Sequence, residues 1–168
     1  MPRIAVSSFK DWNDFARWYW ALVKHQHESN KEMKTLVDKL TKDAKTDAEK
    51  IRRVYEYVVT DIRYNASWEF GIHGFKPYNA TSIFARKFGD CKDKSTLINT
   101  MLRHVGIKSY PVLIFGAQWA SENRGKEDIS LPLISHFNHC ISYVMPDGKR
   151  PGMFLDGTAQ YHPYGTLP

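Results

Sequence analysis

The sequence has little cysteine and no long apolar run. Its 168 residues include only two cysteines, Cys91 and Cys140, which could form one disulfide. We expect two free thiols instead, because Cys91 lies at a predicted helix start and Cys140 lies within a predicted buried strand. No segment approaches the roughly 20 apolar residues of a membrane span, and charged residues interrupt the first twenty positions, where a signal peptide would be apolar. The sequence therefore predicts no membrane span and no disulfide.

The motifs of common metal and phosphate sites are also missing. The chain has no C-x-x-C or H-E-x-x-H spacing, and His136 and His139 would point to opposite faces of one strand. The Gly71 and Gly74 pair is not followed by the Gly-Lys-Ser/Thr of a phosphate loop. The sequence therefore predicts neither a metal site nor a cofactor.

Charge does not identify a partner. The chain has 24 basic and 18 acidic side chains, a net charge of +6. This balance favours acidic partners, but it is too diffuse to indicate nucleic acid, and solubility explains it equally well. We expect no nucleic-acid partner.

The first half of the chain has helical periodicity. Apolar residues recur every three or four positions in three segments, which predicts helices over 9–22, 30–43 and 46–62. Ser8 is a candidate N-cap of the first helix, and Thr46 and Glu49 form a capping box for the third. The aromatic stripe of the first helix suits either the core or a docking surface. A long loop over 63–78 follows.

The second half turns to strands. A short helix from Asn79 or Thr81 is predicted to end at Gly89, and a longer helix covers 92–105. Strands are expected over 109–115, 138–145 and 152–156, with a surface loop over 121–130. Helices first and strands last predict one α+β domain, with a helical lead-in over 1–45 and a core over about 46–168.

Cys91 stands where a thiol can be activated. The break at Gly89 and Asp90 places Cys91 in the first turn of a helix, where backbone N–H groups and the dipole favour an anion. Lys92 and Lys94 would add positive charge, or they are solvated helix residues. Taken alone, Cys91 could equally be a small apolar residue packed at a helix start.

His139 and Asp156 supply the other parts of an activated nucleophile. They fall on two strands that an antiparallel sheet can place side by side, so the carboxylate could orient the imidazole and the imidazole could exchange a proton with the thiol. Separately, His139 could be a core histidine and Asp156 a turn residue before Gly157. Together with Cys91 they predict a catalytic triad.

These segments resemble the transglutaminase-like superfamily. The run Gly89-Asp90-Cys91-Lys92-Asp93-Lys94-Ser95 is similar to its cysteine motif, 138–144 resembles its histidine strand and 154–159 its aspartate strand. The resemblance implies a papain-like fold with Cys91 as nucleophile, His139 as general base and acid, and Asp156 as the residue that orients it. Gly157 stands where many relatives have proline.

The resemblance also implies what the protein acts on. Members cleave or transfer acyl groups of peptides and related amides, so we expect a peptide, protein or cell-wall amide substrate. Such domains occur in longer bacterial proteins that are often exported, and we expect an excised module with a β-rich domain upstream and a periplasmic or extracellular location. The alternative is an inactive binding module of the same fold.

Three further residues are candidates for substrate contact. Relatives use an upstream tryptophan to help bind the oxyanion, and Trp68 is the tryptophan of the preceding loop. Asp90 and Asn138 flank the thiol and the imidazole in the sequence. Asp90, like Asp93, is also explained as a cap of the helix start rather than as a metal ligand.

Overall fold

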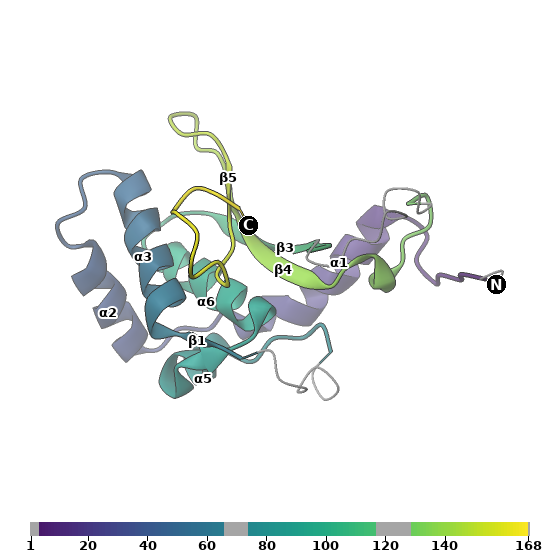
Figure 1. Cartoon of the computed structure of the whole chain (residues 1–168), viewed down its shortest axis with the longest axis horizontal. Coiled ribbons are helices and arrows are strands. Elements are labelled where there is room, and N and C mark those ends of the chain that lie inside the picture. The colour runs from purple at the N-terminus through teal and green to yellow at the C-terminus, as the bar shows by residue number, and fades with distance from the viewer. Residues whose placement is uncertain (1–3, 66–73, 117–128, 168) are drawn as a thin grey trace.

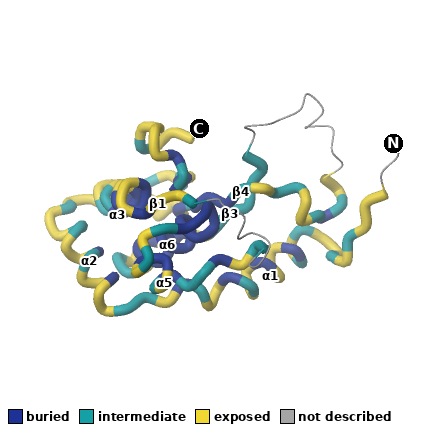
Figure 2. Tube along the Cα trace, turned by 60° about the horizontal axis from the view of Figure 1, so that its bottom comes forward, coloured by how far each residue is buried: buried dark blue, intermediate teal, exposed yellow. Residues whose placement is uncertain are grey.

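The computed structural model describes residues 4–65, 74–116 and 129–167. Helix α6 (Cys91–His104) lies at its centre, and every residue from Cys91 to Leu102 is buried (Figures 1 and 2). A repeat of apolar residues every three or four positions marks only one buried face of a helix, whereas α6 is buried on all sides. The burial of its polar residues could therefore not be predicted from the sequence pattern. The elements in contact with α6 include α2 (Lys31–Thr41), α3 (Asp47–Asp61), α5 (Ala80–Arg86), β3 (Ser109–Ile114) and β4 (His139–Val144).

An antiparallel sheet covers one side of α6. Its strand order is β3-β4-β5, with β5 spanning Met153–Leu155. Leu113 pairs with Cys140 across β3 and β4, and Ser142 pairs with Leu155 across β4 and β5. The predicted α+β fold, with the cysteine helix packed on an antiparallel sheet, is confirmed.

A second, smaller sheet was not predicted. Strand β1 (Arg63–Tyr64) pairs in parallel with β2 (Phe88–Gly89), at the start of the segment expected to be a loop. Two residues are too few to produce a strand pattern in a sequence. Helix α5 ends at Lys87, whose φ is +59°, so the prediction that Gly89 caps this helix is wrong.

Helix α1 (Trp12–Val23) begins later than expected. Its N-cap is Asp11, which accepts a hydrogen bond of 2.7 Å from the Asp14 N–H, so the prediction of Ser8 is wrong. Phe9 lies outside the helix but packs on Phe15, with ring centroids 5.1 Å apart. This contact explains why Phe9 shares the apolar stripe of a helix to which it does not belong.

Helix α3 begins after its expected cap, Thr46, and α2 begins after Asn30, the first residue of its predicted range. Asn30 accepts from the Met33 N–H, and Thr46 accepts from the Glu49 N–H. Buried side chains of both helices, including Val37 and Ile51, join a core that also contains residues of α5, α6 and β5. Two 3-10 turns, η1 (Lys24–Gln26) and η2 (Ile134–His136), complete the described elements. No helix in the described ranges is long and apolar enough to cross a membrane.

Candidate active site

The start of α6 is fixed by two reciprocal carboxylates. Asp90 accepts from the Asp93 N–H at 3.2 Å, and Asp93 accepts in return from the Asp90 N–H at 3.3 Å. The returning Asp93 side chain lies so close to Gly89 that a Cβ there would be 2.6 Å from the Cβ of Asp93. Asp90 and Asp93 therefore form a capping box, for which Gly89 leaves space, and this box fixes the backbone that carries Cys91.

Cations neutralise these buried carboxylates. Arg86 donates to Asp93 at 2.8 Å and stacks over the ring of Tyr78, whose own N–H donates to Asp93 at 2.9 Å. The Lys92 ammonium pairs with Asp90. Burial, and then the charge of Asp90, raise the pKa of Asp93 against these partners. Lys92 is thus a buried partner of the helix cap, and the alternative that it is solvated is wrong.

Lys94 is buried as well, but it contacts the end of α3 instead of the helix cap. Its side chain is 1% exposed, and its ammonium donates to the Ile62 carbonyl at 2.6 Å, at the end of α3. Burial lowers the pKa of Lys94 to about 8, although the charge of Asp156 opposes this. Lys94 therefore ties the end of α3 to α6, and it too differs from the solvated alternative.

His139 and Asp156 meet across the sheet. His139 opens β4, and Asp156 follows directly after β5. Continuing the register of these strands would place Thr158 opposite His139, so Asp156 is its diagonal neighbour, within reach of a long side chain. The two groups form a hydrogen bond of 2.8 Å between His139 Nε2 and Asp156 Oδ2.

The imidazole also interacts with the thiol of Cys91. Burial acts to lower the pKa of His139, but the hydrogen bond to Asp156, the charge of Asp156 and the interaction with Cys91 outweigh burial and raise that pKa to about 10. Burial likewise acts to raise the pKa of Asp156, yet the bond from His139 and two bonds from Thr158 hold it below its ordinary value. The structure thus brings Cys91, His139 and Asp156 together: His139 bonds Asp156, and it lines the same cavity as Cys91.

Two residues near this group were not singled out from the sequence. Thr158 donates its N–H and its hydroxyl to Asp156 Oδ1, at 2.9 and 2.7 Å, which leaves Oδ2 to His139. The Asp-Gly-Thr order is a typical signal of such a local turn. Gly116 lies where a Cβ would be 3.3 Å from that of His139, so it borders the ring closely.

Helix α6 is clasped to β4 by two buried serines. Ser95, one turn after Cys91, donates to the Ile141 carbonyl at 2.9 Å, and its hydroxyl lies 2.9 Å from that of Ser142. Both side chains are at most 1% exposed. The clasp fixes the element that carries Cys91 against the strand that carries His139.

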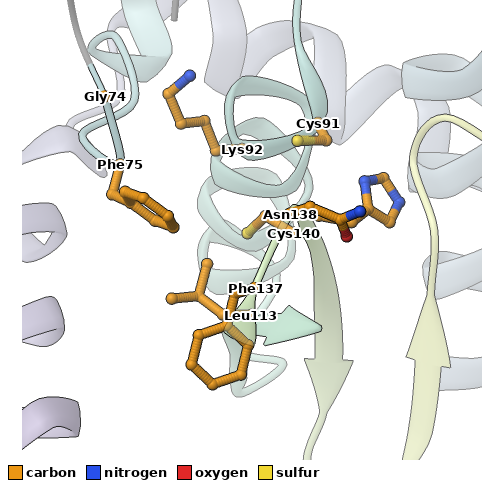
Figure 3. A pocket seen from close by; sticks show the side chains of 9 residues that line it. Gly74, Phe75, Cys91, Lys92, Leu113, Phe137, Asn138 and Cys140 are labelled. Carbon is orange, nitrogen blue, oxygen red and sulfur yellow. The ribbon is translucent and has the colours of Figure 1, made fainter. Parts of the chain in front are cut away.

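A cavity of about 330 Å³ opens beside the thiol. Figure 3 shows Phe75, Leu113 and Phe137 on one side of Cys91, whose sulfur points toward them. The cavity is lined by Gly74, Phe75, Cys91, Lys92, Leu113, Phe137, Asn138, His139 and Cys140.

The three candidate substrate contacts have different positions. Asn138 lines the cavity, but its amide is engaged by Gly116, accepting at 2.7 Å and donating at 3.3 Å. Asp90 is occupied by the helix cap and by Lys92. Trp68 lies outside the described residues. Substrate contact by any of the three stays a prediction.

The second thiol is separate from the first. Cys91 and Cys140 are both free, as expected, and both are buried. The Cys140 sulfur lies 3.7 Å from the Tyr19 hydroxyl on α1. Burial raises the pKa of the Cys140 thiol to about 11. His136 lies in η2 rather than on the strand of His139. Among the described residues, no group of three or more His, Cys, Asp or Glu side chains is placed to hold a metal ion.

Comparison with known proteins adds a family and a fold. The sequence model of the Transglutaminase-like superfamily matches residues 34–145. A search of curated proteins finds no match. Helix α1, which contacts β4 through Tyr19, precedes the matched range.

Two solved structures share the fold. One is a candidate protease from Parabacteroides distasonis, with a TM-score of 0.66 and 16% identity over 89% of this chain and 27% of that one. The other is a candidate cysteine protease from Cytophaga hutchinsonii, with a TM-score of 0.55 and 12% identity over 77% of this chain and 37% of that one. The chain thus spans well under half of either protein.

Proposed function

Because the chain belongs to the transglutaminase-like superfamily and has a cysteine-protease-like fold, we propose that it is a cysteine-dependent acyl-transfer enzyme acting on peptide or related amide bonds. Cys91 is the nucleophile, His139 the general acid and base, and Asp156 the residue that orients the imidazole. One observation carries the proposal: the His139 ring bonds Asp156 at 2.8 Å, and His139 and Cys91 line the same cavity.

The reaction proceeds through a thioester. The Cys91 sulfur bonds to the amide carbon while its proton resides on His139. His139 then gives that proton to the amide nitrogen, the C–N bond breaks, and the amine leaves. Water then attacks the thioester carbon and gives one proton to His139. The C–S bond breaks, the carboxylic acid leaves, and His139 returns the proton to the sulfur.

The helix start stabilises the charged intermediate. The first N–H groups of an α-helix have no acceptor within the helix, and Cys91 is the first residue of α6. We assign the oxyanion to backbone N–H groups at this turn. The reciprocal bonds of Asp90 and Asp93 fix the turn before the substrate arrives, so no reorganisation is needed during the reaction.

We propose water as the usual acceptor. Both structural neighbours are described as candidate proteases, which supports hydrolysis over cross-linking. Because this chain spans only part of each neighbour, a peptide, protein or cell-wall substrate, an upstream β-rich domain and an exported location are all parts of the proposal.

Trapping of the thioester tests this function. The protein is mixed with an N-acylated amino-acid p-nitroanilide and quenched in acid, and its mass is measured by mass spectrometry. In parallel, the release of p-nitroaniline is followed by absorbance. We expect an acyl adduct on Cys91, absent from Cys91→Ala and retained by Cys140→Ala, the matched control at the other free thiol. Adducts at neither cysteine and no released amine would instead support the inactive binding module.

A further inference from the structure

The cavity beside Cys91 has an apolar floor. Leu113 and Cys140 are directly paired across β3 and β4, so their side chains share one face of the sheet. Phe137 lies next to Leu113 and Phe75 lies to one side of the two, as Figure 3 shows, and both rings line the cavity. Phe137 is held in place by Phe15 of α1, with ring centroids 5.4 Å apart.

The polar groups at the cavity edge are already paired. The Lys92 ammonium points away from Leu113 and Phe137 in Figure 3 and pairs with Asp90. The amide of Asn138 is bound to the backbone of Gly116. A charged substrate group that entered here would lose its water without gaining an opposite charge, which costs free energy, whereas an apolar group gains from burial.

The volume of the cavity is large enough for a side chain of the substrate. A volume of about 330 Å³ lies at the lower end of the range of about 300–1,000 Å³ found for ligand pockets. This space is ample for one large side chain of a substrate. Cys91 and His139 both line it, so the side chain would belong to a residue next to the scissile amide.

We infer that this cavity is a specificity pocket for one large apolar side chain, such as that of leucine or phenylalanine, flanking the amide that is cleaved. The inference rests on the proposed function, because it assigns a substrate class to the same site. A side chain of glutamine, aspartate or lysine is disfavoured because Lys92 and the Asn138 amide, at the edge of the pocket, already have partners of their own.

Two substrate series test the inference. In the first, the residue that supplies the acyl group varies among Phe, Leu, Ala, Gln, Asp and Lys; in the second, the residue on the leaving amine varies in the same way. We expect kcat/KM to favour Phe or Leu over Ala by about 10- to 200-fold in one series, which also identifies the side of the amide that enters the pocket. Equal rates across both series, or a preference for a charged residue, would overturn the inference.

Variants locate the preference. Leu113→Trp fills the floor, so the advantage of Phe over Ala in kcat/KM should fall at least tenfold. Phe75→Ala, which removes the ring to one side of Leu113, should also weaken the preference and guards against misfolding of the first variant. Val112→Ala is the matched control, because neighbouring residues of a strand point to opposite faces. An equal loss for all substrates in both pocket variants would contradict the assignment.

Binding separates this inference from the proposed function. N-acetyl amino-acid amides of the same side chains are titrated into Cys91→Ala, which cannot react, and backbone amide shifts are followed by NMR. Saturable shifts at Leu113 and Phe137 with Phe or Leu amides, together with no turnover by the wild type, would refute the enzyme and support the pocket. Turnover without any preference for apolar side chains would support the enzyme and refute the pocket.

Discussion

Replacing Asp156 by asparagine should lower the pKa of His139. The substitution keeps the shape of the side chain but removes the charge that His139 Nε2 meets at 2.8 Å. A hydrogen bond to a charged partner contributes about 1.5–3 kcal/mol, and one pKa unit corresponds to about 1.36 kcal/mol, so the loss amounts to about one to two units. From about 10 in the wild type, the pKa should fall to roughly 8 to 9 in Asp156→Asn.

The assay is a pH titration of histidine Cε1–H resonances by NMR, with the His139 signal assigned from the spectrum of His139→Gln. Thr158→Val is a graded control: it removes the hydroxyl bond to Asp156 but keeps the carboxylate, so the pKa of His139 should change by much less. Cys91→Ser measures the contribution of the thiol separately. A His139 that titrates at the same pH in the wild type and Asp156→Asn would refute the reasoning.

Three further substitutions test the frame of the site by urea unfolding. Ser95→Ala should lose about 1–3 kcal/mol of unfolding free energy, because buried partners on β4 are left unpaired, whereas Ser135→Ala on the surface should lose almost nothing; equal losses would contradict the clasp. Gly89→Ala should lose about 1–3 kcal/mol, because its Cβ meets that of Asp93 at 2.6 Å, and wild-type stability would show that this contact is not restrictive. The pKa of Lys94 is about 8 in the folded state and about 10.5 in the unfolded state. Between pH 8 and 10.5 the unfolded state therefore binds more protons than the folded state, so the free energy of unfolding of the wild type rises with pH over this range, by up to about 3 kcal/mol. Lys94→Met should lack this rise between pH 8 and 10.5, and an unchanged pH profile would refute the assignment.

The sequence predicted the helices and strands whose patterns are local. Thr46 and Asn30 begin their helices as expected, and each of the three strands of the antiparallel sheet lies within its predicted range. Cys91, His139 and Asp156 were identified by residue type and order, because nucleophile, base and orienter need specific chemistry. Their meeting in space depends on the register between β4 and β5, which the sequence does not state.

Features that depend on distant partners were missed. The parallel pairing of β1 with β2 joins segments that lie far apart in the sequence, with α5 between them, so no local pattern marks it. Lys94 has the sequence pattern of a surface residue, and only the carbonyl of Ile62 explains its burial. Gly89 was interpreted as a helix end, although its lack of a side chain serves the close approach of Asp93. The Lys94 error thus arises from a side chain that satisfies a distant backbone group, whereas the missed sheet arises from pairing between two backbone segments.

The rate at which Cys91 is alkylated tests the central claim most directly. Iodoacetamide modification at pH 7 is followed by mass spectrometry in the wild type, His139→Ala and Cys140→Ala. If the imidazole activates the thiol, Cys91 reacts at least tenfold faster than a simple model thiol, His139→Ala removes this advantage, and Cys140→Ala preserves it. A Cys91 that reacts no faster than the model thiol, at a rate unaffected by His139→Ala, would contradict the proposed enzyme.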